Sequence, residues 1–210
     1  MDRNLGATTV TTNTVSTLGL LYQWGRKDPF PGSASTSANT EPTLYNASGT
    51  IGSTDMINNA STSSLDNAIK NPLTFYTGSD WCSIPNDAFW GGADISSPTD
   101  KTMFDPSPAG WRVPSLKGSA SPWSKFSTGT FSLDATDLGR TYTDGSFYPV
   151  AGYRSSSSGA LRSVGGNGRS WSGSPNGSGG YYLLFYSSGV NSASRSARAY
   201  GFSVRCVQDK

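Results

Sequence analysis

The sequence predicts an α+β domain with short strands, few helices and long loops. Short runs of aromatic and β-branched residues bounded by turn residues are typical of strands, and they occur at 130–133, 147–153, 181–186 and 200–207. The stretches between such runs are rich in Ser, Thr, Asn and Gly, which are typical of surface loops. Helical signals are sparse, so we expect strands and loops to dominate.

The composition predicts one folded domain. Aromatic residues make up 12% of the chain and charged residues only 14%, the reverse of a disordered chain. The 210 residues suffice for one large domain, and because no linker-like break divides them we expect a single domain over residues 1–210. The net charge of +2 gives no general attraction to nucleic acid or to a membrane surface. No run of about 18 apolar residues occurs, so we expect no membrane insertion.

The first half of the chain is predicted to hold a long loop and one short helix. Residues 32–63 are polar and rich in small residues, which indicates a surface excursion. Ser64 has the character of an N-cap, and the apolar residues within 65–69 follow on one helical face. The dipeptide Asn71-Pro72 ends this helix. The aromatic residues that follow are expected to fill the core or anchor loops: Phe75, Tyr76, Trp81, Phe89 and Trp90.

Alternation along two strand candidates predicts the orientation of their side chains. In the run 200–207, one face is expected to carry Tyr200, Phe202, Val204 and Cys206. In the run 181–186, the inward pair is expected to be Leu183 and Phe185. The outward side chains of that run are then Tyr182, Leu184 and Tyr186.

The residue inventory argues against catalysis. The chain has no histidine, which removes Ser-His-Asp and Cys-His machinery and the commonest metal ligand. Glycoside hydrolysis needs two carboxylates, and Asp80 with Asp87 or Asp134 with Asp137 are available. No motif surrounds either pair, so we interpret them as solvated loop residues. No phosphate-binding loop or zinc-site spacing occurs. We therefore expect a protein that is not an enzyme and uses no cofactor or metal.

The two cysteines, Cys82 and Cys206, are far apart in the sequence. A separated pair of this kind predicts either one long-range disulfide or two buried thiols. Cys206 lies on the apolar face of its strand candidate, which favours a bridged or unreactive role. Both alternatives remain open from the sequence.

The last third of the chain has an unusual composition. Residues 151–203 contain fifteen Ser and eleven Gly but no Asp, Glu, Lys or Gln, and all their charged residues are Arg. The strand-like runs GYYLLFYSSGV and AYGFSVRCV within and just after this stretch exclude a flexible linker. Tyr, Ser, Gly and Arg on strand-supported loops are typical of binding surfaces. The alternative is an ordinary solvated loop rich in small residues.

Five motifs, taken together and in this order, resemble a known family. They are MDRNLGA at 1–7, LYQWGRKDPFP at 21–31, DPSPAGWRVPS at 105–115, PVAGYR at 149–154 and GFSVRCV at 201–207. The chain resembles the Fibrobacter succinogenes major paralogous domain family of bacterial surface proteins. This resemblance implies a C-type-lectin-like fold of the formylglycine-generating-enzyme-like subtype. Family members often carry Cys where this chain has Ser107, which leaves Cys82 as the remaining partner for Cys206.

The last third also resembles the variable region of proteins that diversity-generating retroelements diversify. Adenine mutagenesis in those systems yields a residue set without Lys, Glu, Gln, Met and Trp, and only Trp171 of these occurs in 151–203. The resemblance implies a variable ligand-binding region at about 167–200. The variable positions implied are Arg169, Ser170, Ser172, Ser174, Tyr182, Leu184, Tyr186, Ser194, Arg195, Ser196, Ala197 and Tyr200.

The function implied is ligand or receptor binding by a variable protein displayed on a phage, a virus or a bacterial surface. The alternative is a fixed-specificity carbohydrate-binding or adhesin domain of a bacterial surface protein. Either reading expects a protein or glycan ligand on a target cell surface and a virion-surface, extracellular or cell-surface location. A homo-oligomer is compatible with both.

Overall fold

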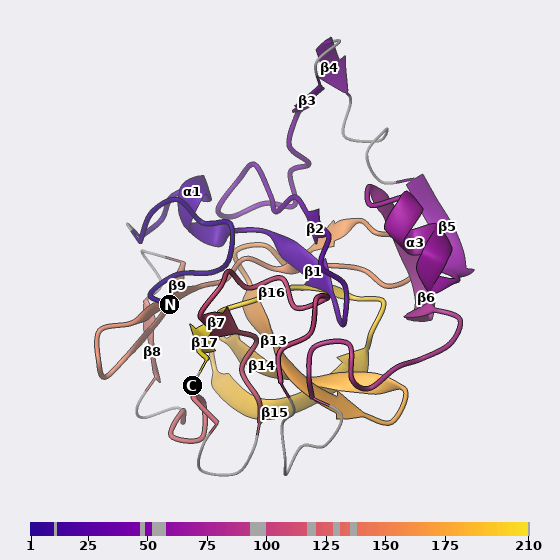
Figure 1. Ribbon diagram of the computed structural model, residues 1–210. Helices are drawn as coiled ribbons and strands as arrows, with labels where there is room; N and C mark the ends of the chain where they lie inside the picture. The colour runs from indigo at the N-terminus through magenta and orange to yellow at the C-terminus, as the bar shows by residue number, and fades with distance from the viewer. Residues whose placement is uncertain are drawn as a thin grey trace.

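The computed structural model describes residues 1–10, 12–46, 49–51, 58–92, 100–116, 121–127, 131–134 and 138–209. Within these residues the protein is mostly β-sheet, and its helices are the short α1 (Val15–Leu18) and α3 (Leu65–Lys70). The structure therefore confirms the α+β class with short strands, few helices and long loops (Figure 1).

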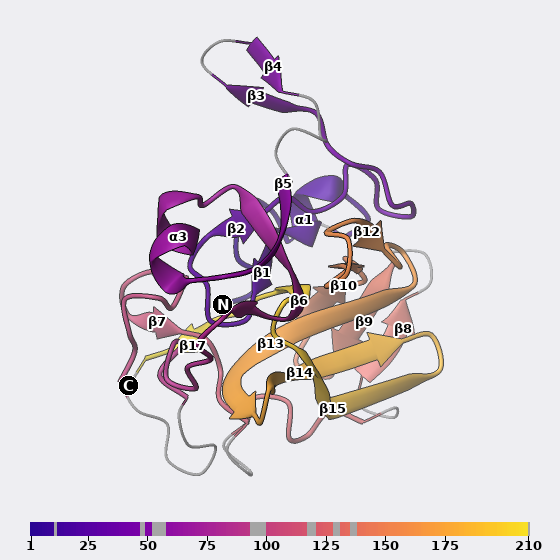
Figure 2. The same ribbon diagram turned by 90° about the vertical axis from the view of Figure 1, so that its right-hand side faces the viewer.

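The main sheet has eight strands, and most of it comes from the last third of the chain. Its order is β12–β11–β16–β13–β14–β15, with β1 paired to β16 and β2 paired to β1. Its strands are β1 (Leu21–Gln23), β2 (Pro29–Phe30), β11 (Tyr153–Arg154), β12 (Leu161–Arg162), β13 (Asn167–Asn176), β14 (Gly179–Tyr186), β15 (Gly189–Ala197) and β16 (Gly201–Ser203). Strands β13, β14 and β15 form an antiparallel ribbon along one side of the molecule (Figure 2).

Smaller sheets surround the main one. A three-stranded sheet has the order β10 (Phe147–Pro149), β9 (Gly139–Tyr142), β8 (Phe131–Asp134). Strand pairs are formed by β7 (Trp111–Arg112) with β17 (Val207–Gln208), β3 (Leu44–Asn46) with β4 (Gly49–Ile51), and β5 (Asn58–Ser63) with β6 (Thr74–Cys82). The β3–β4 hairpin projects away from the body, as both ribbon views show.

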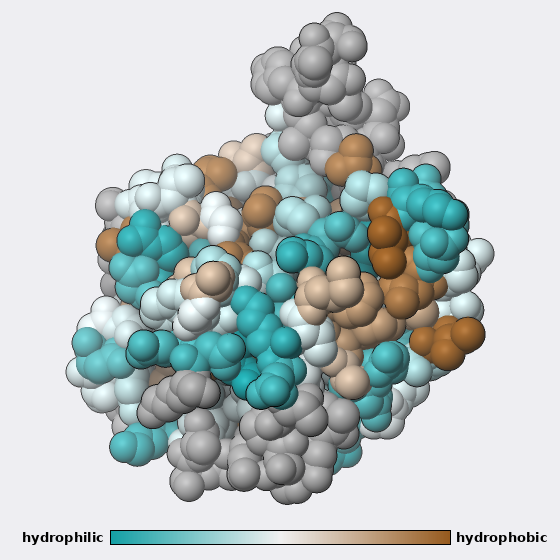
Figure 3. All heavy atoms as spheres, in the orientation of Figure 1, coloured by the Kyte–Doolittle hydropathy of each residue, from teal (hydrophilic) through white to brown (hydrophobic). Residues whose placement is uncertain are grey.

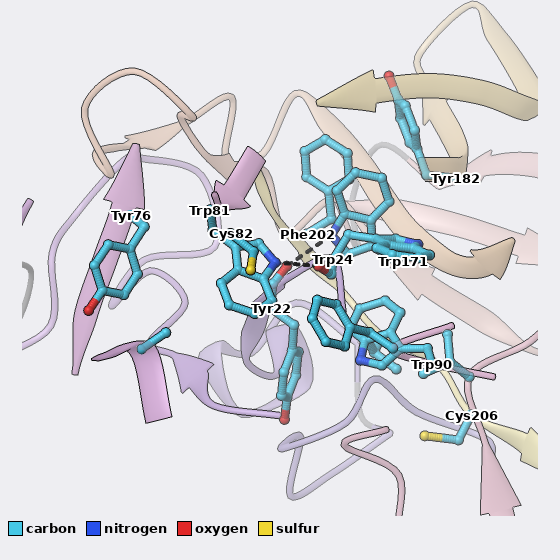
Figure 4. Close-up of a cluster of buried hydrophobic side chains, with 14 residues drawn as sticks. Tyr22, Trp24, Tyr76, Trp81, Cys82, Trp90, Trp171, Tyr182, Phe202 and Cys206 are labelled. Atoms are coloured by element: carbon cyan, nitrogen blue, oxygen red, sulfur yellow. Dashed lines mark hydrogen bonds between the residues drawn. The ribbon is translucent and has the colours of Figure 1, made fainter. Parts of the chain in front are cut away.

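The main sheet separates two hydrophobic cores. Successive side chains of a strand point to opposite faces, and in β14 Tyr182 belongs to one core while Leu183 belongs to the other. The larger core is rich in tryptophan and includes Trp24, Trp171 and Phe202 (Figure 4). The indole N–H of Trp171 donates to the carbonyl of Tyr22 at 2.9 Å, and the other indole N–H groups of this core also donate to backbone carbonyls. We call these the tryptophan core and, for the cluster that contains Leu183, the second core.

Helix α3 forms where the sequence predicts it. The side chain of Ser64 accepts a hydrogen bond from the backbone N–H of Asn67 at 3.2 Å and so caps the first turn. Asp66 in the first turn and Lys70 in the last turn complement the helix dipole, and the helix ends before Asn71. The predicted boundaries of this helix are confirmed.

Two of the predicted strands are interrupted in the structure. The run 147–153 divides at Gly152, whose φ of +67° is a left-handed conformation, so β10 and β11 belong to different sheets. The run 200–207 divides between β16 and β17. Residues 201–206 are buried without alternation, because both faces of β16 are covered. Of the run 130–133, residue 130 lies outside the described residues.

Candidate ligand-binding surface

Strands β13, β14 and β15 carry all the predicted ligand-binding residues except Tyr200, which directly precedes β16. The register pairs Trp171 with Tyr182, and Tyr182 with Ser194, across the three strands. Strand β15 lies at the end of the main sheet, so one of its backbone edges has no neighbour in that sheet. These residues therefore lie on three neighbouring strands of the main sheet.

Five predicted ligand-binding residues are buried, and the outward orientation predicted for Tyr182 is wrong. They are Ser170, Ser172, Ser174, Tyr182 and Ser194. The Ser172 hydroxyl donates to the Tyr181 carbonyl at 3.0 Å, and the Ser174 hydroxyl oxygen accepts from the backbone N–H of Leu116 at 2.9 Å. These contacts occupy the hydroxyl groups within the fold.

Tyr182 is the clearest departure from the expected pattern. Its ring lies 4.7 Å from the ring of Phe202 and 5.7 Å from the ring of Trp171, between centroids, and only 6% of the residue is exposed. The inward orientation of Leu183 and Phe185 is as predicted, since both are buried in the second core. The prediction fails for Tyr182 because the tryptophan core covers the face that was expected to meet solvent.

The remaining predicted residues are at least partly open to solvent. Tyr186 is 41% exposed. Arg195 is also exposed. The half-buried members are Arg169, Leu184, Ser196, Ala197 and Tyr200.

The open residues divide between the two faces of the sheet. Directly paired residues of neighbouring strands share a face, and Arg169 is paired with Leu184 on the face of the tryptophan core. Arg195 is paired with Tyr181, whose ring packs against the second core. Arg169 and Arg195, predicted as parts of one surface, therefore lie on opposite faces of the sheet.

The first face presents a group of partly open residues that we call the tyrosine–arginine face. Its members are Tyr153, Arg169, Leu184, Tyr186 and Tyr200. The Arg169 guanidinium carbon lies 3.8 Å from the ring centroid of Tyr153, a close cation–π stack. The rings of Tyr153 and Tyr200 meet edge to face at 5.7 Å. Tyr153 was missed from the sequence, because it is remote from β14 along the chain.

The opposite face carries an open hollow of about 590 Å³. Its lining is formed by Leu116, Ser121, Ser124, Tyr181, Ser192, Ala193 and Arg195. The Arg195 guanidinium lies 5.4 Å from the Tyr181 ring centroid, so the hollow offers one cation, one aromatic ring and several hydroxyls. Only Arg195 of this lining was predicted; no local signal links residues 116–124 to β15.

Comparison with protein families, characterised proteins and solved structures found no match. The surface must therefore be interpreted from its own chemistry. Among the described residues, no helix has the length and hydropathy of a membrane span. The same residues contain no group of three or more acidic, Cys or His side chains arranged to hold a metal ion.

A second hollow, of about 540 Å³, lies beside α3 and contains none of the predicted residues. Its lining is formed by Arg26, Lys27, Asp28, Leu65, Ala68, Ile69, Trp81, Met103 and Phe104. Apolar side chains gather on this part of the surface, as the brown and tan spheres near α3 show (Figure 3). Ile69 and Met103 are 56% and 76% exposed.

Asp80 and Asp87 both lie against Arg198. The carboxylate of Asp80 is 3.7 Å from one guanidinium nitrogen, and Asp87 accepts a hydrogen bond from another. Burial raises the pKa of Asp80, although the backbone N–H of Cys82 and the Arg198 charge both favour its ionised form. Arg198 itself is buried against the Trp24 ring at 4.4 Å. This arrangement holds the loop around Asp87 to the sheet. Of the other carboxylate pair considered in the sequence, Asp137 lies outside the described residues.

Of the two alternatives for the cysteines, the structure has the second: Cys82 and Cys206 are free and buried. Both belong to the tryptophan core (Figure 4). Burial raises the pKa of each thiol, and the Cys82 thiol donates to the Ile84 carbonyl at 3.2 Å. The disulfide alternative is therefore not the one found, and buried thiols of raised pKa are poor nucleophiles.

Proposed function

We propose that this protein is a ligand- or receptor-binding domain of C-type-lectin-like fold whose last third is diversified by a retroelement. It would be displayed on a phage, a virus or a bacterial surface and bind a ligand on a target cell. Binding would rest on surface complementarity, with a rigid scaffold presenting exchangeable side chains.

The observation that carries this proposal is that β13–β15 contain both buried side chains, which fix the strands, and side chains that are open to solvent. Buried side chains such as Trp171, Tyr182 and Phe185 anchor the ribbon in two cores. Tyr186 and the edge strand around Arg195 remain open. A ribbon fixed by alternate residues can vary the others without losing its fold, which is what a diversified binding surface requires.

The contact set that we propose is narrower than the one expected from the sequence. It keeps the open positions Arg169, Leu184, Tyr186, Arg195, Ser196, Ala197 and Tyr200. The buried serines and Tyr182 are assigned to the scaffold. Tyr and Arg are among the residues that dominate interaction energies, and they make up four of these seven positions.

Sequencing this locus across a natural population is the direct test of diversification. We expect substitutions at the seven contact positions and near-constancy at Trp171, Tyr182, Leu183 and Phe185. A neighbouring reverse transcriptase and a near-identical template repeat would accompany them. An invariant segment 167–200 would overturn diversification and leave the fixed-specificity adhesin as the surviving reading.

Binding to intact target cells tests the contact set. Replacing Tyr186 and Arg195 by Ala should weaken cell binding, whereas Arg162→Ala should not, because Arg162 is an exposed residue of β12 outside the set. Unchanged binding with all seven positions replaced by Ala would reject this surface.

A further inference from the structure

Arg169 differs from the buried arginines in that its guanidinium has no acceptor among the described residues. Arg26, Arg154, Arg198 and Arg205 each donate to carbonyl or carboxylate oxygens. The Nε of Arg169 is buried and has no hydrogen-bond partner among the residues that the structure describes. A buried N–H without an acceptor destabilises a fold, because it has lost its hydrogen bond to water and gained none. The position is therefore costly for the isolated domain.

The faces around the guanidinium limit how an acceptor can approach. The ring centroids of Tyr153, Phe202 and Tyr182 lie 3.8, 5.1 and 5.8 Å from its central carbon. Rings stacked on a guanidinium leave its N–H edge as the place for hydrogen bonding. Because Nε is buried, a partner reaches this edge at the two terminal Nη groups, which match the two oxygens of a planar carboxylate through two parallel N–H bonds.

No carboxylate of the chain's own last third can fill this role, since residues 151–203 contain no Asp or Glu. We propose that Arg169 binds an Asp or Glu side chain of a protein partner, edge-on and beneath the Tyr153 ring. This inference rests on the proposed function and names the chemistry of the ligand at one point of the tyrosine–arginine face.

The surroundings of Arg169 favour an acidic protein segment over an acidic sugar. Sugar hydroxyls are commonly bound by several carboxylate or amide acceptors, and residues 151–203 contain no Asp, Glu or Gln; their amide side chains are Asn167, Asn176 and Asn191. The face instead offers donors and apolar area, in the tyrosine hydroxyls and in Leu184. Tyrosine and arginine side chains of this kind are typical of hot spots in protein interfaces.

The test uses the full chain and three immobilised polymers, measured by biolayer interferometry. They are poly-L-glutamate, its neutral analogue poly(hydroxyethyl-L-glutamine), and polysialic acid as the acidic glycan. We expect selective binding to poly-L-glutamate and a loss of about tenfold in Arg169→Gln, the size expected for a lost charge-assisted pair. Arg169→Lys should also weaken binding, because an ammonium cannot form the two parallel bonds.

Arg162→Gln is the matched control, since Arg162 is exposed and lies in the same charge-poor third. Equal losses in Arg162→Gln and Arg169→Gln would show nonspecific charge attraction and overturn the proposal, as would unchanged binding in Arg169→Gln. Stronger Arg169-dependent binding to polysialic acid would overturn the protein partner. Thermal unfolding of each variant confirms folding, and Arg169→Lys serves if Arg169→Gln does not fold.

The two proposals fail separately. If the wild-type protein does not bind poly-L-glutamate while the contact positions vary in the population, only the role of Arg169 is rejected. An invariant locus would reject diversification but would not affect the conclusion that Arg169 binds a carboxylate.

Discussion

Arg154 and Glu41 form a doubly hydrogen-bonded ion pair that fastens a long N-terminal loop to the main sheet. The two bonds, from Nη1 to Oε1 and from Nη2 to Oε2, are 3.1 and 2.7 Å long. The Arg154 side chain is fully buried and also donates to the carbonyls of Pro31 and Gly159. Glu41 is the only glutamate in the chain, so no other residue of its type can replace it.

Glu41→Gln should lower the free energy of unfolding. Removing one partner leaves the Arg154 charge buried and unpaired, a change that costs roughly 3–5 kcal/mol in fully buried pairs. We expect about 2 kcal/mol here, because the Glu41 side chain retains 30% exposure. Urea unfolding measures the change. Asp66→Asn breaks the exposed Asp66–Lys70 pair and should cost less than about 0.5 kcal/mol; equal effects would contradict the role of Arg154.

Gly168→Ala should destabilise the ribbon by overpacking. A Cβ at Gly168 would lie 2.0 Å from the Phe185 ring, which is buried in the second core, so we expect a loss of roughly 1–3 kcal/mol. Adding Phe185→Leu to Gly168→Ala should restore part of the lost stability, because it removes the ring that the new Cβ meets. A double-mutant cycle measures this coupling. Gly166→Ala is the control, since its nearest contact beyond its chain neighbours is an ordinary 3.5 Å. Additive effects at 168 and 185 would rule out this contact as the cause.

Tyr182→Ala and Tyr186→Ala should have opposite consequences although both residues lie on one face of β14. The first removes a buried ring from the tryptophan core and should cost about 3 kcal/mol of stability. The second removes an exposed ring and should change stability by less than about 0.5 kcal/mol while weakening binding to target cells. Chemical denaturation and cell binding separate the two. Equal stability losses would place Tyr186 in the scaffold as well.

The thiols of Cys82 and Cys206 should resist alkylation in the folded protein. Burial raises the pKa of both thiols, so less of the reactive thiolate is present at pH 8 than in the unfolded chain. We expect negligible labelling by iodoacetamide in buffer and two labelled cysteines in denaturant without reductant, read by mass spectrometry. Finding no free thiol in denaturant would mean that the disulfide forms after all.

Local signals predicted part of this structure well. The N-cap at Ser64 and the stop at Asn71 depend only on neighbouring residues, and the helix between them is as expected. The inward orientation of Leu183 and Phe185 follows from alternation and is also correct. Each of these features is decided within a few residues of the chain.

The orientation of Tyr182 could not be predicted in the same way. Alternation shows which residues share a face, but it cannot show that the second face is also covered. The cover comes from Trp171 and from Phe202, which reaches this face through the parallel pairing of β16 with β13. The stacking of Tyr153 on Arg169 likewise depends on tertiary structure that the local sequence does not encode.

The position of β14 between two cores has a consequence for how such a protein can evolve. Successive residues of that strand pack alternately in the tryptophan core and in the second core. Few positions in it can therefore be substituted without loss of packing. Strand β15 has a neighbour on one side only, and several of its residues meet solvent. Under the binding function proposed above, substitutions that change recognition are therefore expected along this edge strand, while the interior of the ribbon stays constant because its residues are packed in the two cores.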